Sequence, residues 1–137
     1  MVGSEYHRPD THRSSAYLIS ISLTGALVYF LNRGILVPAF PEFSFFKNYL
    51  GDMLALPVYV PLSVYAARKL KLISGSYFPG IWGMLLGAAI FSLVFEMVIP
   101  ALDETSITDA YDVLAYVSGG LVLYAVDRMV LSGTNLS

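Results

Sequence analysis

Four long apolar runs constrain this chain more than any other feature. They cover residues 16–37, 49–67, 78–99 and 111–131. Each is close to the roughly 20 residues that a helix needs to cross about 30 Å of hydrocarbon. With 56% hydrophobic and 13% charged residues among 137, and a mean hydropathy of +0.66, the chain is too apolar for an ordinary soluble domain. The runs therefore predict an all-α, polytopic membrane protein with four transmembrane helices.

Short polar segments flank the predicted membrane domain. Residues 1–15 form a polar N-terminal tail, residues 16–132 the membrane domain, and residues 133–137 a short C-terminal tail. The two histidines, His7 and His12, lie in the first tail without a regular pattern around them, which does not favour a metal site. The first apolar run is too long for the core of a removable signal peptide, about 7–15 residues, so we expect it to be retained as a helix.

Charge and residue content exclude several classes of function. A formal net charge of −2 provides no broad basic surface for nucleic acid. The absence of cysteine excludes disulfides, a thiolate nucleophile and cysteine-ligated metals. Because the sequence pairs no nucleophile with a base in a recognisable motif, it does not predict an enzyme.

The basic residues predict how the helices are oriented. Six of the eight would lie on one side of the membrane and two on the other: Arg8, Arg13, Arg68, Lys69, Lys71 and Arg128 against Arg33 and Lys47. Since cytoplasmic loops are enriched in Lys and Arg, both termini are expected in the cytoplasm, in a multi-pass protein of the cell inner (plasma) membrane. Helices joined by short loops alternate in direction, which predicts an antiparallel four-transmembrane-helix bundle.

Small residues and prolines predict how the helices pack. Small-residue seams in the third and fourth helices would let a neighbouring helix approach closely. They are formed by Gly80, Gly83, Gly87 and Ala88, and by Gly119 and Gly120. Pro57 and Pro61 predict a kink or an unwound turn in the second helix, since each removes a backbone donor. The stretch FPEFSFF, residues 40–46, is typical of an interfacial re-entrant or belt segment.

Three carboxylates distant in sequence are predicted to reach the same membrane depth. Asp52 begins the second helix, Glu96 lies one turn before the end of the third, and Asp112 lies in the first turn of the fourth. Under the predicted topology all three face outward, at the end opposite to the termini. Residues about four apart share a helix face, so each helix has a small or polar stripe that can turn inward. Together these stripes would form a polar mouth that opens to the outside.

Several acids also have a local interpretation. Asp52 suits a helix N-terminus and Asp109 a helix cap, where an acid satisfies free backbone amides. Asp103 and Glu104 are typical of a solvated loop. At the other end, Asp127 and Arg128 are interpreted as charges at the membrane interface.

Glu96 is the acid that most needs an explanation. It lies in an apolar run near a helix C-terminus, where the dipole disfavours a negative charge and membrane burial costs up to roughly 2.5–3.5 kcal/mol. Protonation, a salt bridge to Arg33, or a shared cation would each compensate that charge. The last alternative predicts a site for a divalent cation such as Mg²⁺. Its ligands would be Asp52, Glu96 and Asp112, with Asn48, Asp109 and Tyr116 in support.

The motifs NYLGDMLALP, FEMVIP and TDAYDVLAYVSGG resemble those of a known group of proteins. They are similar to short bacterial four-helix membrane proteins that are often labelled magnesium citrate secondary transporter, and distantly to VanZ-like membrane proteins. The resemblance covers roughly residues 45–125. It implies a four-helix membrane fold, and the label implies transport of a metal–carboxylate.

Two functions from different classes remain open on the sequence. The first is a small protein, expected to act as an oligomer of itself, whose outward-facing carboxylates bind or translocate a cation, proton or metal–carboxylate. The second is a non-catalytic accessory subunit that packs on a larger membrane protein complex through its glycine seams. Both predict the lipid bilayer as surroundings.

Overall fold

The computed structural model describes residues 14–103 and 109–134, and these residues form helices and short connections with no strand among them. His7, His12 and Glu104, on which the sequence analysis commented, lie outside the described residues. In chain order the elements are α1 (Ser15–Leu31), the π-helix η1 (Asn32–Leu36), α2 (Val37–Ala39), α3 (Ser44–Asn48), α4 (Leu50–Lys69), α5 (Ile81–Leu93), the π-helix η2 (Val94–Val98), α6 (Ile99–Leu102) and α7 (Ala110–Thr134).

Four helical segments are long and apolar enough to cross a membrane, which confirms the predicted number of apolar helices. They are Ser15–Ala39, Ser44–Lys69, Ile81–Leu102 and Ala110–Gly133. The second starts earlier than predicted because α3 continues almost directly into α4. The fourth continues through Gly133 and Thr134, which were assigned to the C-terminal tail.

Two of these segments contain a wide π-helical turn just before a proline. In η1 the Val37 amide donates to the Asn32 carbonyl, and in η2 the Ile99 amide donates to the Val94 carbonyl, five residues back in both cases. The next residues are Pro38 and Pro100. A proline ring clashes with the carbonyl four residues before it in an α-helix, and a wider turn relieves that clash. Each segment therefore continues past its proline instead of ending there.

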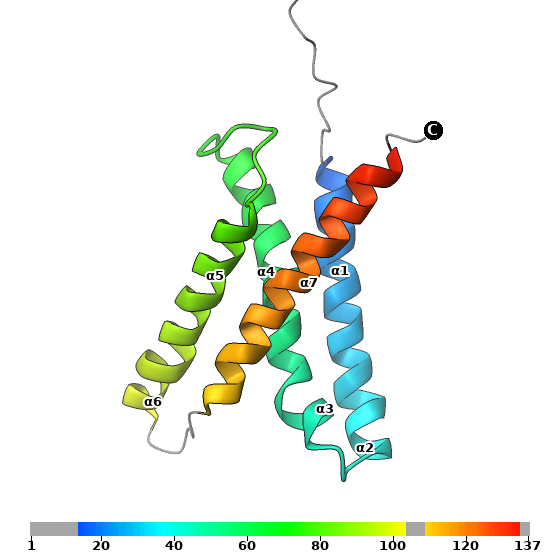
Figure 1. Cartoon of the computed structure of the whole chain (residues 1–137), viewed down its shortest axis with the longest axis vertical. Helices are drawn as coiled ribbons and strands as arrows, with labels where there is room; N and C mark the ends of the chain where they lie inside the picture. The colour runs from blue at the N-terminus through cyan, green and yellow to red at the C-terminus, as the bar shows by residue number, and fades with distance from the viewer. Residues whose placement is uncertain (1–13, 104–108, 135–137) are drawn as a thin grey trace, which may run out of the picture.

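The long helices pack in the order α1, α4, α7, α5. The main packing pairs are α1 with α4, α4 with α7, and α5 with α7. Figure 1 shows α5 and α1 on opposite sides of the molecule, with α4 and α7 between them, and the chain direction alternating from one long helix to the next. Because α1 and α5 stand apart, no helix of the described residues covers the side of α4 between them.

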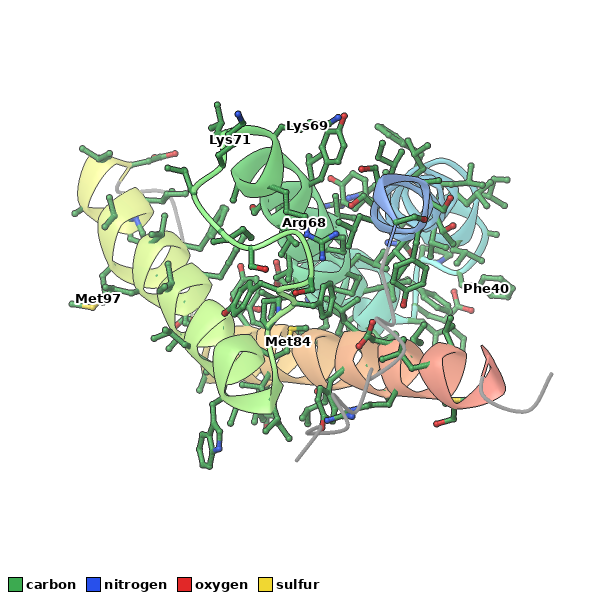
Figure 2. All side chains as sticks on the ribbon, turned by 90° about the horizontal axis from the view of Figure 1, so that it is seen from above. Phe40, Arg68, Lys69, Lys71, Met84 and Met97 are labelled. Atoms are coloured by element: carbon green, nitrogen blue, oxygen red, sulfur yellow. The ribbon has the colours of Figure 1, made fainter. Side chains whose placement is uncertain are left out.

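A small apolar core lies where α4, α5 and α7 meet. Leu56, Ala88 and Tyr116 form its buried cluster, and Met84 is also fully buried. Figure 2 shows Met84 among the helices and Met97 projecting from the outer side of its own helix. The many exposed apolar side chains on the outer faces of these helices, such as Trp82 and Leu102, suit lipid surroundings.

The α-helix α4 is continuous through Pro57 and Pro61, so the alternative of an unwound turn at these prolines was wrong. Pro57 has no amide to donate to the Met53 carbonyl, and α7 covers that carbonyl at Gly119. On the other side, the Ser22 hydroxyl of α1 donates to the Val58 carbonyl at 2.8 Å. Neighbouring helices therefore cover or bind the backbone oxygens near the prolines, which allows the helix to continue in a membrane.

Glycines make this close packing possible. A Cβ atom added at Gly119 would overlap the Met53 carbonyl oxygen and lie 2.8 Å from its carbon atom. At Gly120 it would lie 3.1 Å from Leu56 Cδ1, and at Gly25 of α1 it would lie 2.8 Å from Val58 Cγ2. Gly87 of the predicted seam faces Leu56, whereas nothing lies near Gly80. The glycines in contact thus serve packing inside the chain.

Replacing Gly119 with alanine should destabilise the protein, because the new methyl group meets backbone and not a side chain that can rotate away. We expect a loss of about 1–3 kcal/mol or more in the free energy of unfolding. Titration with denaturing detergent, followed by circular dichroism, measures it.

The matched control is Gly133→Ala in the same helix, where nothing lies within 4 Å of an added Cβ. This variant should keep or slightly exceed wild-type stability, since alanine favours a helix by up to about 1 kcal/mol over glycine. Equal stability of the two variants would contradict the packing described for Gly119.

Candidate functional site

A carboxyl pair joins α4 and α7 at one end of the molecule. Asp52 lies in the first turn of α4 and Asp112 in the first turn of α7. Their carboxyl groups are close enough for a side-chain hydrogen bond. The Tyr116 hydroxyl, one turn further along α7, donates to Asp52 Oδ1 at 3.2 Å. We call Asp52 and Asp112 the carboxyl pair.

Asp109 has the capping role that its local interpretation predicted. Its Oδ1 accepts a hydrogen bond from the Tyr111 amide at 3.1 Å, and its carbonyl accepts from the Asp112 amide at 3.0 Å. The other oxygen, Oδ2, accepts from the Tyr49 hydroxyl at 3.1 Å. Asp109 therefore fixes the start of α7 and ties it to the residue that precedes α4.

A cavity of about 430 Å³ opens beside Asp52, on the side of α4 that no helix covers. Its polar lining comes from Arg33, Lys47, Asn48, Asp52 and Tyr116. The rest of its lining is apolar or aromatic and includes Tyr29, Phe30, Val58, Tyr59, Phe91 and Phe95. We call this space the Asp52 cavity. It combines a polar end with an apolar wall, as small-molecule sites of about 300–1,000 Å³ usually do.

Asn32 positions the polar end of this cavity. Its side chain is fully buried, and Nδ2 donates to the Phe46 carbonyl at 2.8 Å. That bond holds α3 against η1, so Lys47 and Asn48, which follow Phe46, reach the cavity. Asn32 lies in the wide turn before Pro38. In the sequence it belongs to the small or polar stripe of the first helix, with no sign of its partner Phe46.

Arg33 lies beside Asp52. Both line the Asp52 cavity, and the guanidinium charge acts on the Asp52 carboxyl. The guanidinium carbon of Arg33 also lies 5.8 Å from the centre of the Tyr29 ring, within the range of a cation–π interaction. The salt bridge to Glu96 suggested by the sequence stays a prediction, and among the described residues the acid on the same cavity as Arg33 is Asp52.

Glu96 faces a different space. It lines a second cavity of about 410 Å³ between α5 and α7, together with Ser92, Met97 and Val113. Phe91 and Phe95, which directly precede Ser92 and Glu96, line the Asp52 cavity instead. Successive residues of a helix point about 100° apart, which explains why neighbours in sequence reach different cavities. The charges of Asp112 and Asp109 still act electrostatically on Glu96.

The predicted ligand set of Asp52, Glu96 and Asp112 is therefore divided. Within residues 14–103 and 109–134, no group of three or more histidine, aspartate or glutamate side chains could hold a single metal ion. Asp52 and Asp112 meet, Tyr116 supports them directly, and Asn48 lines the same cavity as Asp52. Membrane depth was the basis of the predicted set, and depth alone does not fix which face of a helix a side chain occupies.

Asp127 is a buried acid near the other end of α7. Its side chain is only 2% exposed, and its Oδ1 accepts a hydrogen bond from the Tyr17 hydroxyl of α1 at 3.1 Å. The sequence predicted a charge at the membrane interface and did not predict this burial between helices. The available signal was its spacing, because Asp127 follows Tyr116 and Leu123 on the same face of α7 that begins at Asp112.

Comparisons with known proteins assign no family. No family model matches the chain, and neither a curated protein nor a solved structure matches it.

The hydrogen bond between Tyr116 and Asp52 should contribute measurably to stability. Tyr116→Phe removes its donor while keeping the ring that packs against Phe91 and Phe95. We expect a loss of about 1 kcal/mol in the free energy of unfolding, since a half-buried acceptor loses one hydrogen-bond partner. Detergent denaturation compared with wild type measures this loss.

Tyr111→Phe on the same helix is the matched control. The Tyr111 side chain is 63% exposed, and no hydrogen bond of its hydroxyl is found within the described part of the chain. Its stability should equal that of the wild type. If both variants lose the same amount, the Tyr116 hydroxyl has no special part in joining α4 to α7.

Proposed function

We propose that this chain is a small multi-pass membrane protein that binds a cation at the carboxyl pair of Asp52 and Asp112. The observation that supports it is the meeting of two carboxyl groups from helices far apart in sequence. One of them, Asp52, lines the polar end of an open cavity. Two carboxylates repel each other unless a proton or cation lies between them. If Asp52 and Asp112 served only the N-termini of their own helices, their side chains would not need to lie next to each other.

The oxygen donors at this place suit a hard cation. Two carboxylates, with the Tyr116 hydroxyl and the Asn48 side chain nearby, are the ligand types of Mg²⁺ and Ca²⁺. Mg²⁺ usually keeps several of its waters and is held by only one or two carboxylates, so the third carboxylate predicted from the sequence is not needed. The cavity of about 430 Å³ has space for those waters.

The proposed orientation is an antiparallel bundle with both termini in the cytoplasm. Arg68, Lys69 and Lys71 gather at one end of the molecule, which Figure 2 views from above. Lys69 Nζ lies 5.6 Å from the Tyr65 ring centre and the Arg128 guanidinium carbon 5.2 Å from that of Tyr124, which suits a membrane interface. This basic end would face the cytoplasm and the carboxyl pair would face outward.

The accessory-subunit alternative has less support. It required glycine seams that are available to a partner, but Gly119, Gly120 and Gly87 are in close contact with other residues of this chain. The exposed apolar side chains are compatible with lipid as well as with a partner, so they do not favour a complex.

The orientation can be tested with single cysteines, because the chain contains none of its own. Ser44→Cys starts α3 near the carboxyl pair, and Ser76→Cys lies in the connection between α4 and α5; both serines are exposed. In intact cells a membrane-impermeant maleimide should label position 44 and leave position 76 unlabelled until the cells are opened. The reverse pattern would place the carboxyl pair in the cytoplasm.

Cation binding should stabilise the protein through the carboxyl pair. With Mg²⁺ at one hundred times its dissociation constant, we expect a gain of about 2.7 kcal/mol in unfolding free energy at constant ionic strength. Asp52→Asn and Asp112→Asn should each remove most of this gain. Thermal unfolding with Mg²⁺, Ca²⁺ or additional Na⁺ measures it.

Glu42→Gln is the control for this experiment. Glu42 is an exposed acid outside the Asp52 cavity, so its variant should keep the full effect of Mg²⁺. A stabilisation that is absent in the wild type, or that survives both aspartate substitutions, would refute the proposed divalent site.

A further inference from the structure

We propose that the Asp52 cavity binds the headgroup of a membrane phospholipid that carries both a phosphate and a primary ammonium group. The inference rests on the proposed function in one respect, since Asp52 would be the cation-binding carboxylate in both. It adds an organic cation as the occupant and a second, anion-binding half of the same cavity.

The charges at the polar end of the cavity have two signs. Arg33 and Lys47 lie in its lining, contributed by η1 and α3, and Asp52 lies in the lining contributed by α4. A guanidinium and an ammonium group suit a phosphate, because both donate charge-assisted hydrogen bonds to its oxygens. A carboxylate suits a primary ammonium group for the same reason. A ligand with both groups matches all three side chains, whereas a simple anion would leave Asp52 unmatched.

The deeper lining is apolar and extends along the helices. From Arg33 the cavity follows α1 back to Ala26, about 10 Å at 1.5 Å per residue, and it follows α4 forward to Tyr59. Val58 and Phe91 belong to this deeper part. Such a wall suits the glycerol region and the first methylene groups of an acyl chain. A small soluble zwitterion would leave it without contacts.

The cavity is open toward the lipid. It is lined from both α1 and α5, which stand on opposite sides of the molecule (Figure 1). Phe30 of α1 and Tyr59 of α4 line it and are 70% and 52% exposed. In a bilayer these exposed ring surfaces face hydrocarbon. A phospholipid can therefore enter from the side with its acyl chains remaining in the membrane, so the cavity volume has to hold only the headgroup and the start of a chain.

The arrangement also distinguishes among headgroups. A primary ammonium group can donate hydrogen bonds to Asp52, whereas the quaternary ammonium of a choline headgroup has no N–H to donate. A glycerol headgroup has a phosphate for Arg33 and Lys47 but no cation for Asp52. Phosphatidylethanolamine should therefore bind better than phosphatidylcholine and phosphatidylglycerol with the same acyl chains.

The test is lipid competition on the full chain. The purified, delipidated protein in a non-ionic detergent receives an equimolar mixture of the three lipids, and native mass spectrometry records which lipid stays bound. We expect phosphatidylethanolamine to exceed each of the others by about tenfold, the factor that a charge-assisted hydrogen bond can provide. Equal retention of all three overturns the proposal, as does a preference for phosphatidylglycerol. Displacement of the lipid by an equal concentration of free phosphoethanolamine overturns the assignment to a membrane lipid.

Paired variants locate the binding. Arg33→Gln should lose most of the bound lipid, whereas Lys69→Gln, a cation at the opposite end, should not. Asp52→Asn should lose the preference for ethanolamine over choline, and Glu42→Gln should keep it. Unchanged retention in Arg33→Gln overturns the proposed phosphate site. Because the wild-type competition needs no variant, the proposal can fail even if a variant does not fold.

The same variants separate this inference from the proposed cation function. Arg33→Gln should still be stabilised by Mg²⁺, because it retains both carboxylates. A wild type that is stabilised by Mg²⁺ but retains all three lipids equally refutes only the lipid inference. A wild type that prefers phosphatidylethanolamine without any effect of Mg²⁺ refutes only the divalent site.

Discussion

The contact between the Met53 carbonyl and Gly119 is the constraint on which the site depends. Pro57 leaves that carbonyl without its helical donor, and an uncovered backbone oxygen is costly inside a membrane. Only a residue without a side chain lets α7 approach closely enough to cover it. A proline in one helix and a glycine in another thus form one structural unit, although 62 residues separate Pro57 from Gly119.

This contact also sets the register between the two helices that carry the carboxyl pair. Met53 follows Asp52 directly, and Gly119 lies about one turn beyond Tyr116 on α7. Fixing Met53 against Gly119 therefore brings the Tyr116 hydroxyl to Asp52 and the start of α7 to the start of α4. Asp109 then holds that start through the Tyr49 hydroxyl. Packing one turn deeper thus holds the two carboxyl groups together against their mutual repulsion, and a cation between them would remove that repulsion.

The sequence predicts the helices well because hydrophobic length is a local property. It also predicts that Asp52, Glu96 and Asp112 lie at a similar depth, since depth follows from position along a helix. It does not predict which face of a helix points toward which neighbour. Phe91 and Glu96 reach different cavities because five residues of an α-helix turn them about 140° apart, and the wide turn before Pro100 changes that angle. The burial of Asp127 was likewise missed, because its partner Tyr17 lies 110 residues earlier, at the start of a helix whose packing no local pattern specifies.

The inner face of α7 has an acid at each end, and the residues between them bear on whether the described conformation could transport a cation. Asp112 and Asp127 are fifteen residues apart, about 22 Å along a helix. Between them lie Leu123 of the same helix and the fully buried Leu56 and Met84 of its neighbours. A cation at the carboxyl pair would meet these apolar side chains before it reached Asp127. Binding at one membrane surface therefore needs only the conformation described, whereas transport would need α7 to move relative to α4, against the contact of Gly119 with Met53.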